Sequence, residues 1–182
     1  MNNNLIITIG REYGTGGREI GQKLALRLGI PFYDRELITR AAKKTGFDEK
    51  LFEQLDKRAT NSFLYSLTMF GSVGLNGMSL TDQLYLAQSN VIREMAEESS
   101  CVIVGRCADH VLRDCPNKFD FFIHGSIEDR VKRIQTCGDY EIEGKTPQAA
   151  LDKMDKQRST YYNYYTGKVW GKCDHYDLCI NA

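Results

Sequence analysis

The beginning of the chain carries the pattern that most constrains its fold: a short apolar run, a glycine-rich turn and a helix. Residues 5–9 are all β-branched or leucine residues and predict a buried strand that ends at Gly10. Apolar residues then recur at helical spacing from Ile20 to Leu28, and Gly29 is a stop signal. The order of strand, glycine loop and helix predicts an α/β fold with the loop at the carboxyl end of a parallel strand.

The alternation of strands and helices continues along the chain. Helices are expected at about residues 81–98, 127–134 and 146–162, and a stretch with three glycines and two serines at 71–79 predicts a mobile loop. We therefore expect a single domain over residues 1–182, with a parallel sheet of about five strands flanked by helices. The core strands are predicted near residues 5–9, 31–33, 101–104, 119–124 and 176–180.

The composition excludes several classes of protein. Lysine plus arginine equal aspartate plus glutamate at 24 each, so no overall field favours nucleic acid or an anionic membrane as a partner. No stretch approaches the roughly 20 apolar residues of a membrane span, and the start lacks a signal-peptide pattern, which predicts a cytoplasmic protein. Six cysteines without a Cys-x-x-Cys pair and three histidines indicate neither a zinc site nor a redox motif. Nothing indicates the oligomeric state.

The loop after the first strand has the composition of a phosphate site. Backbone N–H groups of such a turn close around an anion, and the following helix adds positive potential at its N-terminus. A merely tight turn is the alternative, and a dinucleotide fingerprint fits less well because its acidic residue would have to be Asp34. The loop residues proposed to bind donor phosphate are Gly10, Gly14, Thr15, Gly16, Gly17, Arg18 and Glu19.

The standard phosphate-loop motif, Gly-x-x-x-x-Gly-Lys-Ser/Thr, is absent. Placing residues 17–19 over its last three positions puts Arg18 where the lysine would reach the β- and γ-phosphates. Glu19 then stands where a magnesium-binding hydroxyl is expected, and the first glycine is shifted. An arginine fork can clamp phosphate, but it is bulkier than lysine, so the activity and the metal ligands stay open.

Several further segments resemble cytidylate kinases. Residues 32–40, Phe-Tyr-Asp-Arg-Glu-Leu-Ile-Thr-Arg, are similar to the family segment Leu-Asp-Ser-Gly-x-x-Tyr-Arg, with Asp34 and Arg40 matching and Arg35 in place of serine. Gly105-Arg106-Cys107 resembles the family's Gly-Arg-Asp, and residues 152–158 resemble its Asp-x-x-Arg helix. The resemblance implies an acceptor site formed by Asp34, Arg40, Arg106, Asp155 and Arg158. The glycine loop and the tyrosine-rich run at 161–165 resemble the cytidylate kinase-like branch.

The resemblance also implies a fold, an activity and cofactors. The fold would be a three-layer P-loop kinase fold with an acceptor-binding helical insert at about 36–98 and a lid at about 128–160. The activity would be phosphoryl transfer from ATP, with Mg²⁺, to a nucleoside monophosphate, cytidylate being favoured. Arg18 and the lid residues Arg130 and Arg133 would stabilise the charge of the transferred group, since catalysis of this reaction depends on positioning and cationic clamps.

Other interpretations of these residues remain open. Arginines on helices commonly pair with neighbouring acids rather than with a ligand. The tyrosines at 161–165 fit packing of the last helix as well as base stacking. The chain as a whole is also compatible with a non-catalytic nucleotide-binding or regulatory module, or with a kinase for another small acceptor, because Arg35 and Cys107 alter residues expected near the nucleotide.

Overall fold

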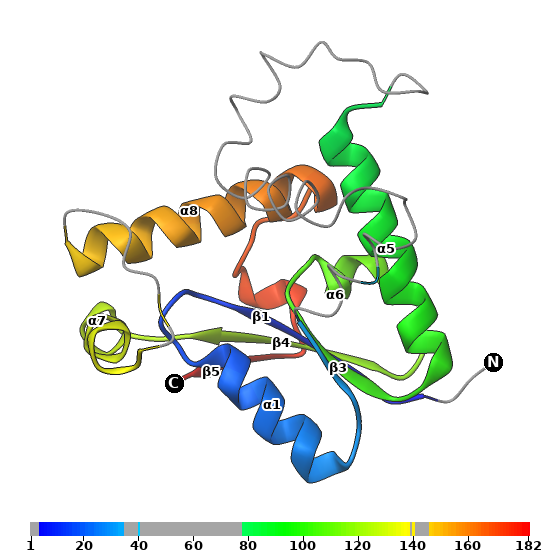
Figure 1. The fold of residues 1–182 in the computed structure, drawn as a ribbon, viewed down its shortest axis with the longest axis horizontal. Helices are drawn as coiled ribbons and strands as arrows, with labels where there is room; N and C mark the ends of the chain where they lie inside the picture. Colours follow the sequence, from blue (N-terminus) through cyan, green and yellow to red (C-terminus); the bar gives the residue numbers. More distant parts are fainter. Residues whose placement is uncertain (1–3, 35–39, 41–77, 139, 141–145) are drawn as a thin grey trace.

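The computed structural model describes residues 4–34, 40, 78–138, 140 and 146–182. All five described strands are parallel and lie in the order β2-β3-β1-β4-β5, which confirms the predicted parallel sheet (Figure 1). Most of the predicted insert, residues 36–77 apart from Arg40, lies outside the described residues, as does most of the predicted glycine-rich loop at 71–79. The strands are β1 (Ile6–Arg11), β2 (Phe32–Tyr33), β3 (Cys101–Val104), β4 (Lys118–His124) and β5 (Leu178–Asn181).

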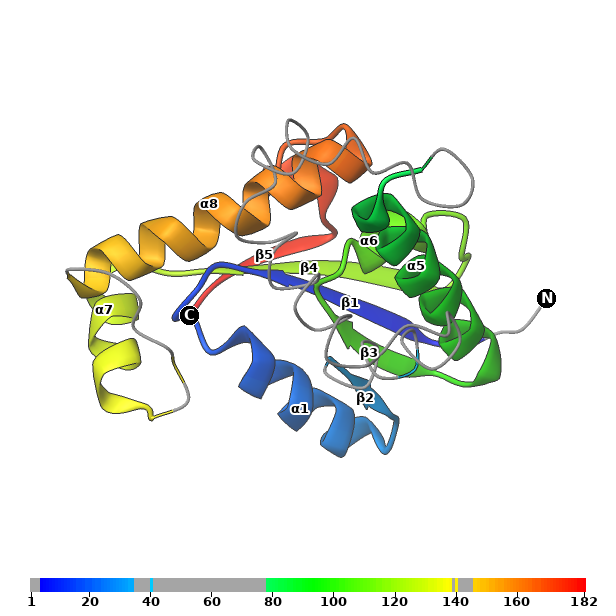
Figure 2. The ribbon, with the colours of Figure 1, turned by 45° about the horizontal axis from the view of Figure 1, so that its top comes forward.

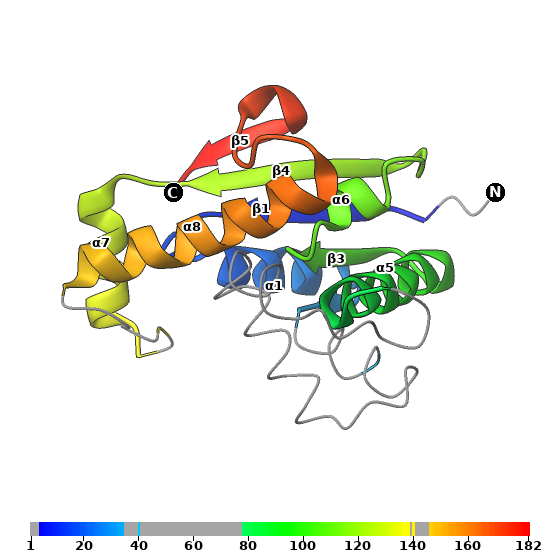
Figure 3. The ribbon, with the colours of Figure 1, turned by 90° about the horizontal axis from the view of Figure 1, so that it is seen from above.

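The sheet is covered by helices on both faces (Figures 1 and 2). Alternate residues of β1 point to opposite sides, so Ile6 packs toward α5 and α6, while Ile7 and Ile9 pack toward α1. Helix α8 lies on the same side as α5 and α6, and α7 packs against the first half of α8 (Figure 3). The helices are α1 (Gly17–Leu28), α5 (Leu80–Glu98), α6 (Ala108–Val111), α7 (Ile127–Thr136) and α8 (Pro147–Thr166), and a 3₁₀ turn, η1, spans Cys173–His175.

Parallel pairing brings the ends of the two central strands together. Ile9 of β1 is in register with Val104 of β3, and the Gly105 N–H donates to the Ile9 carbonyl at 3.0 Å. The glycine loop after β1 and the Gly105-Arg106 segment after β3 therefore start side by side. The carboxyl edge of a parallel sheet is the usual ligand site of such folds.

The tyrosine-rich end of α8 is part of the core. Tyr161 and Tyr162 are buried in a cluster with Cys107, and Tyr165 stacks on Tyr85 of α5 with ring centroids 3.9 Å apart. These contacts favour packing over base stacking for this run, although the partners are α5 and α6 rather than the edge of the sheet. None of the helices in the described segments combines the length and apolarity that a membrane crossing requires.

Candidate functional site

The glycine loop joins β1 to α1 through residues with left-handed backbone. Gly14 has φ 82° and Gly16, the N-cap of α1, has φ 74°, conformations that glycine adopts without strain. A Cβ at Gly14 would stand 3.0 Å from the Arg130 carbonyl oxygen, so the loop is also too closely packed for a side chain there. The buried Thr15 donates its hydroxyl to the Glu12 carbonyl at 2.9 Å, which stabilises the turn. The loop thus presents the N-terminus of α1 to an anion.

Beneath this loop lies a set of paired charges, which we call the loop-supporting network: Glu12, Tyr13, Arg130 and Asp155. Arg130 is only 6% exposed, donates from Nε to the Tyr13 carbonyl at 2.7 Å, and forms ion pairs with Glu12 at 3.2 Å and with Asp155. The Tyr13 N–H donates to Asp155 Oδ1 at 2.7 Å. Both backbone polar groups of Tyr13 are therefore held by side chains from α7 and α8.

The position of these two charged residues differs from their predicted roles. Arg130 was expected to fold over the donor, and Asp155 to bind the acceptor. Burial raises the pKa of Asp155, while the Tyr13 N–H and Arg130 oppose that shift by stabilising the carboxylate. Arg130 and Asp155 neutralise each other inside the protein, and both hold the backbone of Tyr13 in the loop.

A second group of charges, arginines that lie near one another, lies beside the loop; we call it the arginine rim. Arg158 donates from Nη1 to the Arg11 carbonyl at 3.0 Å and lies over the Tyr13 ring. Burial and the nearby Arg11 lower the pKa of Arg158 to about 9. Burial also lowers the pKa of Arg11, with Asp34 opposing and Arg106 and Arg18 adding to the shift. The rim consists of Arg11, Arg18, Arg106 and Arg158.

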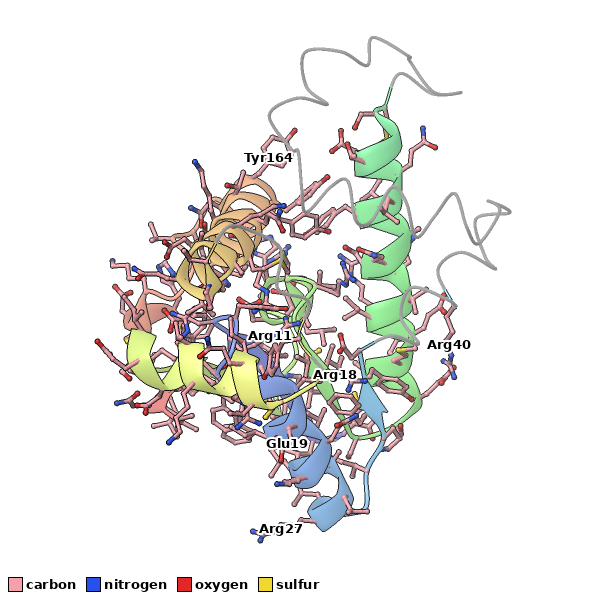
Figure 4. All side chains as sticks on the ribbon, turned by 60° about the vertical axis from the view of Figure 1, so that its left-hand side comes forward. Arg11, Arg18, Glu19, Arg27, Arg40 and Tyr164 are labelled. Carbon is pink, nitrogen blue, oxygen red and sulfur yellow. The ribbon has the colours of Figure 1, made fainter. Side chains whose placement is uncertain are left out.

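Asp34 supplies a carboxylate beside the rim. Arg18 Nε contacts Asp34 Oδ2 at 2.8 Å, and the Arg18 side chain remains about half exposed. Figure 4 places Arg11 and Arg18 close together at the N-terminal end of α1. Guanidinium groups that lie so close to one another create a strong local attraction for an anion.

The residues after β3 adopt an unusual backbone. Gly105, Arg106 and Cys107 all have positive φ, at 77°, 59° and 54°. A left-handed conformation costs a residue with a side chain roughly 1–2 kcal/mol, and such strain is concentrated at functional sites. Cys107 anchors the turn by packing among the buried tyrosines of α8. The turn therefore holds Arg106 in the rim at a cost in stability.

Arg133 of α7 contacts the loop directly. Its guanidinium lies against Gly16, where a Cβ would stand 2.6 Å from Arg133 Cζ. Arg133 also donates to the Tyr140 hydroxyl at 3.2 Å and forms an ion pair with Glu19, which in turn pairs with Lys23. These two cations, Lys23 first, lower the pKa of Glu19. The structure thus places Arg133 against the loop, where it is paired with Glu19.

Two further polar residues belong to neither the network nor the rim. Arg40 contacts Glu98 at 3.3 Å and lies over the Tyr33 ring, well apart from Arg11 and Arg18 (Figure 4), so the structure does not bring it to the rim. Gln157, next to Arg158 on α8, is 8% exposed, and its side-chain oxygen and nitrogen have no hydrogen-bond partner among the described residues. Within those same segments, no group of three or more acidic, histidine or cysteine side chains could hold a metal ion.

Known proteins resemble this chain in both sequence and structure. The model of the cytidylate kinase-like family matches residues 6–182. The chain belongs to this family. A crystal structure of an uncharacterized protein from Eubacterium ventriosum is 35% identical, with 98% of this chain and 89% of that chain covered and a TM-score of 0.67. None of the curated proteins matches the sequence.

More distant structures share the fold of this cytidylate kinase-like chain. Shikimate kinase from Bacteroides thetaiotaomicron is 15% identical with a TM-score of 0.56, covering 98% of this chain and 86% of that one. A gluconokinase from Sinorhizobium meliloti is 15% identical with a TM-score of 0.53, covering 100% and 84%. The predicted P-loop kinase fold is therefore confirmed.

Two residues of this cytidylate kinase-like site, Arg11 and Glu12, were not among the predicted site residues. A signal for Arg11 existed, because it follows a buried strand directly, as Arg106 does. Glu12 carried no such signal, since its partners Arg130 and Gly125 come more than a hundred residues later in the chain.

Proposed function

We propose that this protein transfers the γ-phosphoryl group of ATP to a nucleoside monophosphate, with cytidylate the favoured acceptor. The observation that carries the proposal is the arginine rim beside the glycine loop, at the carboxyl edge of a P-loop kinase sheet. Donor and acceptor phosphates would together bring several negative charges to this edge, which the rim and the N-terminus of α1 are suited to neutralise.

The proposed roles follow from where each side chain lies. The loop N–H groups bind the donor phosphates, and Arg133, already against Gly16, covers the transferred group. Arg106 and Arg158 bind the acceptor phosphate, and Asp34 orients the arginines around it. Arg40 has no part in the proposal because it pairs with Glu98 elsewhere. An acceptor phosphate is already anionic, so the reaction needs no general base.

Mg²⁺ would enter with the donor. This ion prefers oxygen ligands and usually keeps several waters while bound by one or two carboxylates and substrate phosphates. Glu19 lies in the first turn of α1 and Asp34 lies beside the rim, so either could supply the protein ligand. The ion would neutralise charge that develops on the β- and γ-phosphates. A cytoplasmic location, where ATP is plentiful, is part of the same proposal.

The test is phosphoryl transfer from ATP and Mg²⁺ to each nucleoside monophosphate, with shikimate and gluconate as further acceptors. We expect transfer to a pyrimidine monophosphate, reduced about 10²- to 10³-fold in Arg106→Ala, since a preorganised cationic contact contributes that much in other sites. Arg113→Ala is the matched control, because Arg113 is exposed and its contacts among the described residues are its neighbour Asp114 and a local carbonyl.

The remaining outcomes separate the alternatives. Transfer only to a hydroxyl group, as in shikimate, gluconate or another small molecule, would contradict the nucleotide acceptor but support the assignment as a kinase. Binding of ATP with no transfer to any acceptor would contradict the proposal and leave a nucleotide-binding regulatory module.

A further inference from the structure

The cation that a phosphate loop normally carries is missing from its usual place. No lysine occurs among the first 22 residues. The structure gives α1 its N-cap at Gly16 and its first residue at Gly17. With Gly16 as the second glycine of the motif that joins a strand to a helix, the lysine position falls on Gly17, which has no side chain. The position of the first glycine then falls on Arg11.

The space that a side chain at position 17 would need is filled by Arg11. A Cβ on Gly17 would stand 2.7 Å from Arg11 Cβ and 2.9 Å from Arg11 Cγ, which is closer than atoms can pack. The stem of Arg11 therefore begins where the stem of the motif lysine would begin. The two side chains exclude each other, so an arginine at 11 requires a glycine at 17.

The other end of the Arg11 side chain lies at the end of β3. Its guanidinium nitrogen Nη1 lies directly against Gly105, on the side where a Cβ would project. The side chain thus crosses from the end of β1, past the first turn of α1, to the end of β3. Within the described segments Arg11 forms no ion pair, whereas Arg18 is paired with Asp34 and Arg130 with Glu12 and Asp155.

We infer that Arg11 replaces the phosphate-loop lysine and binds the β- and γ-phosphates of the donor. This inference rests on the proposed function for the identity of the ligand, but its geometry does not depend on any acceptor. The charge reaches the loop from the strand before it rather than from the helix after it. A guanidinium contacts two phosphate oxygens at once, whereas an ammonium is a point charge. The burial that lowers the pKa of Arg11 also strengthens its attraction to a bound anion.

The first experiment measures the affinity of the purified full chain for ATP and ADP with Mg²⁺ by calorimetry. Arg11→Ala should weaken binding about 10- to 100-fold, the loss of charge-assisted hydrogen bonds to phosphate. Arg27→Ala is the matched control, because Arg27 is an exposed arginine at the far end of the same helix (Figure 4). Affinity of Arg11→Ala within twofold of the native protein would overturn the inference.

The second experiment exchanges the two positions. Gly17→Lys alone should impair binding because the new side chain collides with Arg11, and Arg11→Gly alone should impair it because the cation is lost. The double variant Arg11→Gly with Gly17→Lys restores the standard order of glycine and lysine and should bind ATP at least about tenfold more tightly than Arg11→Gly. A double variant that melts like the native protein but binds no better than Arg11→Gly would contradict the inference.

The outcomes distinguish this inference from the proposed function. If the native protein binds ATP through Arg11 but transfers phosphate to no acceptor, the inference stands and the kinase proposal fails. If Arg11→Ala transfers phosphate as fast as the native protein, the kinase proposal stands and the inference fails. A native protein that binds neither nucleotide overturns both.

Discussion

The two groups of arginines around the loop use the same side chain in opposite ways. In the loop-supporting network, Arg130 is buried and shared between Glu12, Asp155 and the Tyr13 carbonyl. In the rim, Arg11 lies near Arg18, Arg106 and Arg158, and burial disfavours the charge of both Arg11 and Arg158. The charges of the network are balanced by partners within the protein, whereas the charges of the rim are proposed to be balanced by a bound anion. The local charge balance, more than the residue type, therefore separates the arginines that support the loop from those proposed to bind phosphate.

The largest effect should come from breaking the network. Arg130→Leu leaves Glu12 and Asp155 without their partner, and removing one member of a buried ion pair typically costs 3–5 kcal/mol. We expect the free energy of unfolding in urea to fall by about that amount. Arg18→Leu, which removes an exposed pair, should change it by less than about 1 kcal/mol. Equal losses in the two variants would remove the distinction between network and rim.

The next effect sharpens the contrast within the rim. Arg106→Gly should lower phosphoryl transfer about 10²- to 10³-fold, because a cationic contact to the transferred charge is lost. The same variant should be about 1 kcal/mol more stable than Arg106→Ala, since only glycine adopts the left-handed backbone without strain. Thermal melts and transfer rates of the two variants test both parts. Equal stability of the glycine and alanine variants would show that the backbone at position 106 is not strained.

Gln157 provides a smaller test of whether a buried polar group serves the ligand. Replacing an unsatisfied buried amide by an apolar group of similar shape removes a penalty of about 1–3 kcal/mol. We therefore expect Gln157→Leu to raise stability by about 1 kcal/mol while raising KM for the acceptor more than it lowers kcat. Gln135→Leu, at an exposed position of α7, should change neither quantity. A gain in stability with unchanged KM would assign Gln157 no part in binding.

The smallest effect concerns pH. The folded-state pKa of Arg158, about 9, lies below its usual value of 12.5. An anion binds the charged form, so raising the pH from 8 to 9.5 should weaken binding of the nucleoside monophosphate about fourfold as that form is depleted. The unfolded chain keeps this proton up to about pH 12.5, so the contribution of Arg158 to the stability of the free protein should rise with pH above 9. As the pH rises above 9, the affinity measured by calorimetry should therefore fall while the stability of the free protein measured in melts should rise. Arg158→Met should abolish both trends.

The sequence predicted the sheet better than it predicted the site. Strands such as residues 101–104 are continuous apolar runs that end at glycine, and that local signal is sufficient for a buried parallel strand. The roles of Arg130 and Asp155 could not be predicted, because a charged residue on a helix looks the same whether its partner is a ligand or a residue distant in sequence. The register of the loop was also ambiguous, since it depends on where α1 begins. Only the structure shows Arg11 filling the space beside Gly17.

The position of β1 in the middle of the sheet has a consequence for the synthesis of the chain. Ile6 is made well before its neighbours in the sheet, Cys101 and Lys118. At about 5–20 residues per second, translation leaves this strand without both partners for several seconds. The apolar edge of β1 must stay shielded by transient contacts or chaperones during that time. The glycine loop that follows it gains its shape only when α7 and α8 have also been made, so a nucleotide could assist only the last steps of folding.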